Sequence, residues 1–254
     1  MVNIEVCANS ATSAIAAQKG GAERVELCEN LHEGGTTPSY GQFMFAKKSV
    51  TIPVFPLIRP RSGDFLYSDL EFEIMKADIE HFIANGCDGI VIGMLKTDGS
   101  IDTKRCSELI SIAKSAGIGV TFHRAFDMCR DHFEALEDII AMGCDRILTS
   151  GGKSTAMEGA SIISQLINAA GGRIIIMPGS GITEHNIADL IHFTGATEFH
   201  SSAKVRTDSL MEYLNDHILL SGTGEEFTLE VTASERVKTM LELANGNYNT
   251  NSGC

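Results

Sequence analysis

The feature that most constrains this 254-residue sequence is a structural unit that recurs along most of it. Each copy has a small turn residue, a short apolar run, a polar or glycine-rich stop and an amphipathic stretch. The first and last runs lie seven steps apart, so the mean spacing is about 28 residues, which fits a strand, a crossover helix and two short loops. The runs begin near Ile4, Arg24, Val54, Gly89, Gly119, Arg146, Arg173 and Thr197.

Similar sequence segments precede and enter four of these predicted strands. They read GGAERVEL at 20–27, NGCDGIVI at 85–92, MGCDRILT at 142–149 and TGATEFHS at 194–201. In each segment the glycine at or near its start is expected to end the preceding helix. Ser68 and Asp131 are each followed three residues later by glutamate, which is the spacing of a capping box, and Asp102 and Thr183 are further candidate helix caps.

This pattern predicts an α/β fold, a TIM (β/α)8 barrel, in a single domain with a C-terminal extension. No composition break or Pro/Gly/Ser linker divides the chain, and eight evenly spaced units favour a closed barrel over the alternative, a doubly wound open sheet. The barrel domain is expected over residues 1–246. The extension from residue 203 should hold a short strand at 228–231 and a helix at 234–244, and residues 247–254 read as a disordered tail.

Charge and composition exclude several classes of function. The formal net charge is -13, and no basic stripe is present, so a nucleic-acid partner is not expected. No apolar run reaches the roughly 18 residues that a membrane span needs, and the start lacks a signal segment, so we expect a cytoplasmic protein with no membrane partner. The 7 cysteines are scattered without a CxxC pair, so they should be free thiols.

The predicted barrel interior is unusually polar. Side chains alternate between the two faces of a strand, and the apolar set should face the covering helices. Barrel interiors normally hold Val, Ile and Leu, and buried charges need partners. Two interpretations follow: a structural salt-bridge network, such as Glu5 or Glu26 with Arg59, or a site at the C-terminal face of the barrel. The inward set contains Glu5, Cys7, Glu26, Cys28, Arg59, His123, Glu198 and His200.

The strand ends and the loops after them supply candidate catalytic and anion-binding residues. Histidine beside carboxylates suits acid–base chemistry near neutral pH, and planar arginines with glycine-rich turns suit a phosphate or carboxylate. The alternative is that the arginines pair with Asp64 or Asp127 and that the glycines serve tight turns. The catalytic candidates are Glu5, Glu26, Arg59, His123, Asp127 and His200. The anion-binding candidates are Arg61, Arg124, Ser150, Gly151, Gly179, Ser180, Gly181 and Ser201.

Two cysteines form a candidate metal site. Cys7 and Cys28 each lie two residues beyond an inward glutamate on neighbouring strands. Adjacent strands are about 4.8 Å apart, so the two thiolates can share one soft ion, and Cu(I) is the ion that favours such ligands. The alternative is that both are ordinary small core residues.

Eight motifs carry a family resemblance: EVCANS at 5–10, RVELCENL at 24–31, EGGTTPS at 33–39, IRPRSGDFLYS at 58–68, TFHRAFDM at 121–128, LTSGG at 148–152, MPGSGI at 177–182 and TEFHSSA at 197–203. Over residues 2–244 the sequence resembles the CutC family of copper homeostasis proteins. The resemblance implies a TIM barrel, a cytoplasmic location, a homo-oligomer (dimer or tetramer) and copper handling through Cu(I). The family's candidate copper ligands match Cys7 and Cys28.

Three functions remain open from the sequence. The first is copper homeostasis with Cu(I) bound by Cys7 and Cys28, so that the partner is a copper ion. The second is an enzyme whose partner is a small anionic ligand, such as a phosphorylated metabolite, with Glu26, His123 or Asp127 exchanging protons. The third is an interaction scaffold that retains an unused pocket.

Overall fold

The computed structural model describes residues 1–215, 217–218 and 226–246, and the predicted tail at 247–254 lies outside the described residues. Eight short parallel strands alternate with helices, as the repeat predicted. The strands are β1 (Asn3–Ala8), β2 (Arg24–Leu27), β3 (Val54–Pro56), β4 (Gly89–Ile92), β5 (Gly119–Phe122), β6 (Arg146–Thr149), β7 (Ile175–Pro178) and β8 (Glu198–Ser201).

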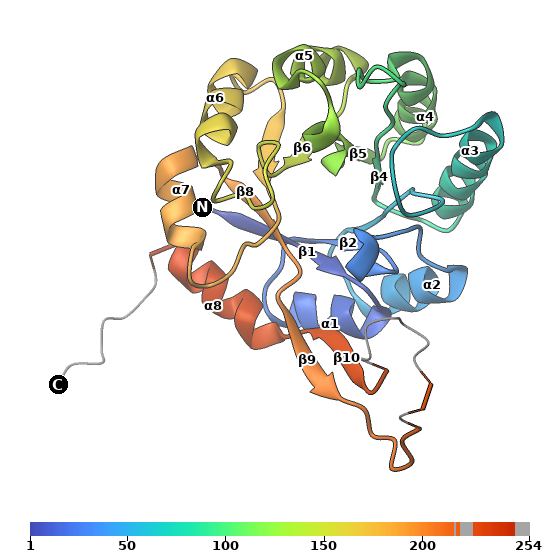
Figure 1. Ribbon diagram of the computed structural model, residues 1–254, viewed down its shortest axis with the longest axis vertical. Helices are drawn as coiled ribbons and strands as arrows, with labels where there is room; N and C mark the ends of the chain where they lie inside the picture. The colour runs from blue at the N-terminus through green and yellow to red at the C-terminus, as the bar shows by residue number, and fades with distance from the viewer. Residues whose placement is uncertain (216, 219–225, 247–254) are drawn as a thin grey trace.

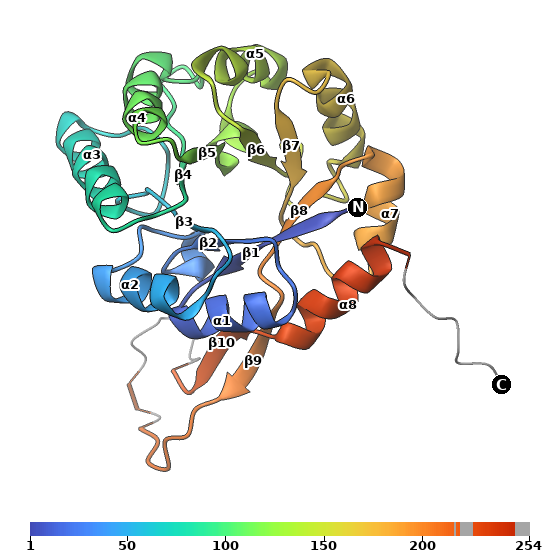
Figure 2. The same ribbon diagram turned by 180° about the vertical axis from the view of Figure 1, so that it is seen from behind.

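Strand pairing shows that the sheet closes on itself. One half has the order β3-β2-β1-β8 and the other β4-β5-β6-β7. Leu57 bridges Val91 between β3 and β4, and the Ile58 N–H donates to the Val91 carbonyl at 2.8 Å. The first strand pairs with both β2 and β8, and β7 lies beside β8 (Figures 1 and 2). The architecture is therefore the TIM barrel and not the open sheet.

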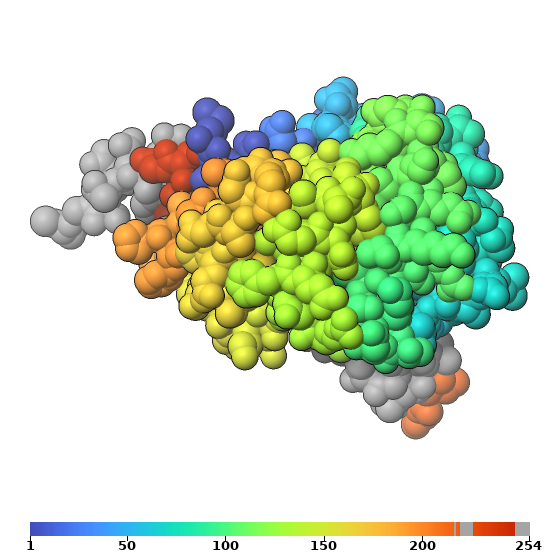
Figure 3. Space-filling view, turned by 90° about the horizontal axis from the view of Figure 1, so that it is seen from above, coloured from blue at the N-terminus to red at the C-terminus, as the bar shows by residue number. Residues whose placement is uncertain are grey.

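Helices cover the outside of the barrel. The Ser68 capping box is present, and the Asp131 and Asp102 side chains each accept a helix N–H. Thr183 was wrongly expected to cap a helix, because the helix that follows begins only after Asn186. The helices are α1 (Ala11–Lys19), α2 (Tyr40–Ser49), α3 (Asp69–Ala84), α4 (Thr103–Ser115), α5 (His132–Met142), α6 (Ala160–Ala170), α7 (Ile187–Thr194) and α8 (Ser234–Ala244). From above, the segments from α3 to α7 lie side by side as an outer wall (Figure 3).

The C-terminal extension completes the barrel. Its helix, α8, lies where the eighth barrel helix belongs, between α7 and α1 (Figure 1). A Cβ atom on Gly20 would lie 2.5 Å from the Ser234 carbonyl oxygen and 2.6 Å from the Val237 Cβ, so the glycine permits this close approach. An antiparallel hairpin of β9 (Lys204–Asp208) and β10 (Thr228–Thr232) is inserted between β8 and α8 and projects from the barrel.

The apolar side chains form two clusters. The larger lies between strands and helices and contains Ile4 and Val6, which face outward as the alternation predicted. The smaller lies inside the barrel and is made by Cys7, Cys28, Phe55, Leu57 and Val91. The Phe55 ring fills the amino end of the barrel, where any side chain on Gly89 or Gly119 would collide with it. The carboxyl end stays open for a site.

Candidate metal centre

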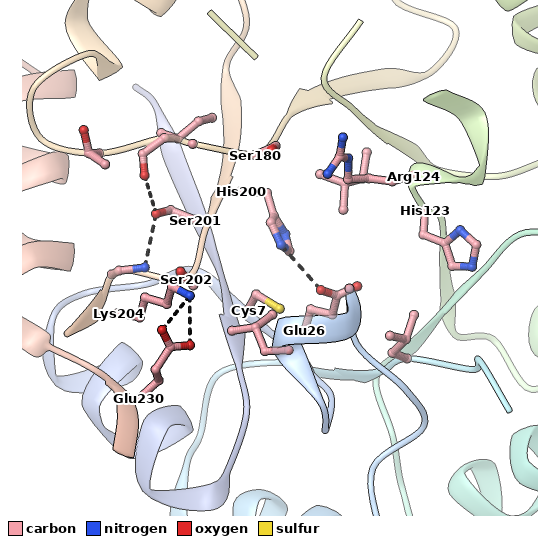
Figure 4. A pocket seen from close by; sticks show the side chains of 18 of the residues that line it. Cys7, Glu26, His123, Arg124, Ser180, His200, Ser201, Ser202, Lys204 and Glu230 are labelled. Atoms are coloured by element: carbon pink, nitrogen blue, oxygen red, sulfur yellow. Dashed lines mark hydrogen bonds and ion pairs between the residues drawn. The ribbon is translucent and has the colours of Figure 1, made fainter. Parts of the chain in front are cut away.

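A cavity of about 560 Å³ opens at the carboxyl ends of the strands. Cys7, Glu26 and His200 line it from three adjacent strands, β1, β2 and β8 (Figure 4). The strand register explains their proximity: Cys7 is paired with Glu26 between β1 and β2, and Glu5 is paired with His200 between β1 and β8.

The two candidate copper ligands are in contact. The Sγ atoms of Cys7 and Cys28 are 3.5 Å apart, and both side chains are buried. The hydrogen bond with Cys28, burial and the nearby Glu26 carboxylate raise the pKa of Cys7 well above its usual value. The Cys7 thiol is therefore protonated at neutral pH in the absence of a metal, and an incoming soft ion must displace that proton.

A second donor set shares Cys7. One ligand atom each from Cys7, Glu26 and His200 lie within 4.8 Å of one another. His200 Nδ1 is 2.7 Å from Glu5 Oε1, and its Nε2 is 3.4 Å from Glu26 Oε2. Burial opposes the charged imidazolium, but the Glu26 and Glu5 carboxylates outweigh it and raise the pKa of His200. If Nε2 binds a metal, the Glu5 carboxylate accepts a hydrogen bond from Nδ1 and so orients the ring.

Glu5 belongs to a buried ionic chain beneath this site. Arg24 Nε donates to Glu5, and Arg24 Nη2 donates to Glu198 Oε2 at 2.9 Å. Arg146 Nε reaches the same Glu198 oxygen at 2.7 Å. Burial alone would raise the pKa of Glu5, but Arg24 and His200 lower it to about 2. The predicted pairing of Glu5 or Glu26 with Arg59 is wrong, because Arg24 is the cation that faces the barrel axis beside Glu5.

Arg59 lies elsewhere on the cavity wall and bonds to backbone. Its guanidinium donates to the carbonyls of Glu33 at 3.0 Å, Gly35 at 2.6 Å and Gly63 at 2.8 Å. It stacks over the Phe65 ring at 5.1 Å. Among the described residues no carboxylate lies within ion-pair distance of it, so its charge faces carbonyl dipoles and the Phe65 ring.

His123 also lines the cavity, but as a neutral ring. Its Nδ1 accepts a hydrogen bond from the Ala125 N–H at 3.1 Å, which leaves the proton on Nε2. Burial and the neighbouring Arg59 lower the pKa of His123 to about 3. Figure 4 shows His123 apart from Cys7, Glu26 and His200. At neutral pH the ring is therefore uncharged, and its Nε2 is buried without a hydrogen-bond partner in the described part of the chain.

Asp127 ties two loops together. Its Oδ1 accepts from Thr149 Oγ1 at 2.5 Å and from the Gly152 N–H at 3.0 Å, and its Oδ2 accepts from Arg124 Nε at 2.8 Å. The Ser150 hydroxyl and N–H also donate to it. With these donors around it, Asp127 does not line the cavity, so among the catalytic candidates Glu26 and His200 are the adjacent ionisable pair that does.

The anion-binding candidates separate into two groups. Arg124, Ser180, Gly181 and Ser201 line the cavity. Four others lie outside its lining: Arg61, Ser150, Gly151 and Gly179. Arg61 instead pairs with Asp64 at 2.9 Å and Glu71 at 2.5 Å, which is the alternative foreseen for the loop arginines.

Sequence reasoning missed two groups of residues. Arg24 has the same strand phase as Glu26, so the alternation alone could have placed it inside. Lys204 and Arg206 on β9, Glu230 on β10 and Arg236 on α8 complete the cavity wall. Lys204 Nζ is 2.8 Å from Glu230, and Arg236 Nη2 is 2.8 Å from Glu184. No local pattern marks these residues, because only the folding of the hairpin brings them to the barrel mouth.

Comparisons with known proteins agree with this architecture. The CutC family model matches residues 2–205. The chain is 48% identical to the human copper homeostasis protein cutC homolog over 243 residues, which is 95% of this chain and 88% of that protein. It is 46% identical to a CutC family protein of Chromobacterium violaceum over 240 residues, covering 94% of this chain and 96% of that protein.

Solved structures lead to the same family. The crystal structure of the putative copper homeostasis protein CutC from Streptococcus agalactiae matches with a TM-score of 0.75 and 35% identity, covering 80% of this chain and 99% of that chain. A thiamine phosphate pyrophosphorylase from Pyrococcus furiosus, at 11% identity and a TM-score of 0.58 over 98% of each chain, shares the fold alone. In the described part of the chain, no helix has the length and apolarity to cross a bilayer. The chain belongs to the CutC family of copper homeostasis proteins.

Proposed function

We propose that this protein binds one Cu(I) per subunit through the Cys7 and Cys28 thiolates. The observation that carries the proposal is the 3.5 Å contact between the two Sγ atoms inside the barrel. Thiolates are the ligands that Cu(I) prefers, and the buried position limits access of water to the ion. The family's role in copper homeostasis supports the same ion.

The sulfur separation also bears on coordination number. With metal–sulfur bonds of about 2.3 Å, sulfurs at 3.5 Å subtend an angle of about 100° at the metal. That angle leaves room for a third ligand, so we propose His200 Nε2 or Glu26 for that position. Zn²⁺ would instead favour the mixed donor set of Cys7, Glu26 and His200, with its sulfur, oxygen and nitrogen atoms.

Anaerobic Cu(I) titration against a chromogenic chelator tests the proposal. The purified protein should take up one equivalent, and the Cys7→Ser/Cys28→Ser variant should take up none. Cys87→Ser is the matched control, because Cys87 is also a buried free thiol but packs in the larger apolar cluster and not with Cys7 and Cys28. Circular dichroism confirms that each variant is folded. Unchanged stoichiometry in the double variant would eliminate this site.

We also propose that the protein works in the cytoplasm as a homo-oligomer, a dimer or a tetramer. A reducing compartment suits the six cysteines of the described residues, all of which are free and buried. Cell fractionation tests the location. Light scattering on the purified protein tests the oligomer, and a monomer mass would contradict it.

A second candidate function is an enzyme that acts on a small organic anion, for example a phosphorylated metabolite. The observation that favours it is the cavity, whose 560 Å³ is far more than one ion needs. Glu26 and His200 would exchange protons, while Arg59 and Arg124 would hold the anion. Mass spectrometry of metabolites retained by the purified protein tests this candidate. Crystals soaked in phosphate should show an anion beside Ser180 and Gly181, and density only elsewhere would count against it.

A further inference from the structure

The cavity reaches only one of the two proposed copper ligands. Cys7 lines it, whereas Cys28 is fully buried and lies outside its lining. A copper ion that enters from solvent therefore meets Cys7 first and Cys28 second. Apolar side chains make up much of the remaining wall, including Leu31, Leu57 and Phe65. A cavity of this volume with this lining suits an organic molecule above the thiol pair.

Cationic side chains gather on the cavity wall, although the protein as a whole is acidic. Five cationic side chains line it with the carboxylates of Glu26 and Glu230, although the chain carries a net charge of -13. Behind the wall, Arg124 pairs with Asp127 and Arg236 pairs with Glu184. Arg59, buried and bonded only to carbonyls, adds a positive charge that no carboxylate offsets within the described residues. A buried cation without a carboxylate partner, beside further cationic side chains, favours an anionic ligand. The five cations are Arg59, Arg124, Lys204, Arg206 and Arg236.

Backbone donors lie on the same wall. Ser180 and Gly181 have positive φ angles of 78° and 71°, a pair of left-handed residues that turns the chain at the end of β7. In the described part of the chain, the N–H groups of Ser180, Gly181 and Ile182 donate to no protein acceptor, and all three residues line the cavity. Successive free amides of this kind bind carboxylate or phosphate oxygens.

We propose that the cavity binds the small anionic thiol that carries Cu(I) to Cys7. The inference rests on the proposed copper function and names the form in which the ion arrives. Cu(I) is held by soft sulfur ligands, so its carrier is a thiolate, and Arg59 with the 180–182 amides favours a thiol that also bears anionic groups such as carboxylates. The carboxylates would contact the cationic side chains and the 180–182 amides, and the carrier sulfur would lie beside Cys7.

The transfer is a ligand exchange that conserves charge and oxidation state. The bond between Cu(I) and the carrier sulfur breaks, and a bond between Cu(I) and Cys7 Sγ forms. The Cys7 thiol proton passes to the departing carrier thiolate, which leaves as a neutral thiol group. A Cu(I) ion carried by two such thiolates makes a second exchange of the same kind, in which its bond to the second carrier sulfur breaks, a bond to Cys28 Sγ forms, and the Cys28 proton leaves with that carrier as a neutral thiol. No electron is transferred, so no oxidant or reductant is needed.

The test compares two Cu(I) donors that differ in charge. Cu(I) is supplied as its complex with reduced glutathione, which carries carboxylates, or with mercaptoethanol, which carries none, and the rate of uptake is followed. The variant Arg124→Gln/Lys204→Gln should take up Cu(I) from glutathione about tenfold more slowly for each carrier carboxylate that no longer meets a cation. Its uptake from mercaptoethanol should change less than about twofold, since that donor has no carboxylate. Lys76→Gln, on α3 away from the cavity, should match the wild-type protein with both donors.

A copper-free measurement separates this inference from the proposed function. S-Methylglutathione keeps the charges but cannot transfer a thiolate, and calorimetry should show that it binds the Cys7→Ser/Cys28→Ser variant as well as the wild type. Equal uptake from both donors in wild type and in Arg124→Gln/Lys204→Gln, with no S-methylglutathione binding, would overturn the carrier site and leave Cu(I) binding intact. Copper uptake that survives the cysteine substitutions would instead overturn the proposed function.

Discussion

Replacing Arg24 with methionine removes the cation that joins Glu5 to Glu198 inside the barrel. The Arg24 side chain is 7% exposed and that of Glu5 is 1% exposed, so the substitution leaves a buried carboxylate without its main partner. Breaking a buried ion pair on one side costs about 3–5 kcal/mol of unfolding free energy. Arg173, which pairs with Glu137 at the surface, is the control, and Arg173→Met should cost less than about 1 kcal/mol.

The pH dependence of this cost follows from Glu5. Its folded pKa of about 2 lies below the ordinary 4.5, so Glu5 contributes stability that is present above pH 4.5 and is lost as the pH falls through 2. A difference of about 2.5 pKa units corresponds to about 3 kcal/mol. In Arg24→Met the pKa of Glu5 should rise instead, because burial is then less opposed. The stability deficit of the variant should therefore be largest at pH 7 and should shrink toward pH 4.

Urea unfolding at pH 7, 6, 5 and 4 measures this deficit directly. The wild type, Arg24→Met and Arg173→Met are compared at each pH, with Cu(I) excluded. A deficit for Arg24→Met that stays constant over the whole range would refute the assigned role of Arg24, because its loss would then act through packing and not through the charge of Glu5.

Three further predictions concern the barrel interior. Because the folded pKa of His123 is about 3 against an ordinary 6.5, the stability that its neutral ring contributes is present above pH 6.5 and is lost as the pH falls, at roughly 1.4 kcal/mol per pH unit. His123→Gln should remove this pH dependence from the stability measured by urea unfolding between pH 7 and 5. An unchanged pH dependence in the variant would contradict the assignment. Gly89→Ala should cost about 1–3 kcal/mol because its methyl group overlaps the Phe55 ring, and Phe55→Leu in the same chain should recover part of the stability in thermal unfolding. Glu5→Gln should weaken Cu(I) binding about 10–100-fold if His200 is the third ligand, and equal affinity in the chelator titration would remove His200 from the coordination shell.

The sequence predicted some features of the candidate site and not others. The inward positions of Glu5, Cys7, Glu26 and Cys28 follow from strand alternation, which is a property of a few consecutive residues. The contact between the two cysteines follows because consecutive strands of the repeat are neighbours. The protonation state of His123 was not predictable from the sequence. Its tautomer depends on a hydrogen bond from the N–H two residues later, and its neutrality depends on burial.

Sequence alone therefore determined the barrel, its eight units and the polar inner face, since each rests on a short local period repeated along the chain. Tertiary structure alone decided which charges meet: Glu5 bonds to His200, 195 residues away, and Arg24 bonds to Glu198, 174 residues away. Closure of the barrel creates these contacts by bringing the first and last strands together. The cations Lys204, Arg206 and Arg236 reach the cavity wall for the same reason, because the hairpin and α8 follow β8, which pairs with β1.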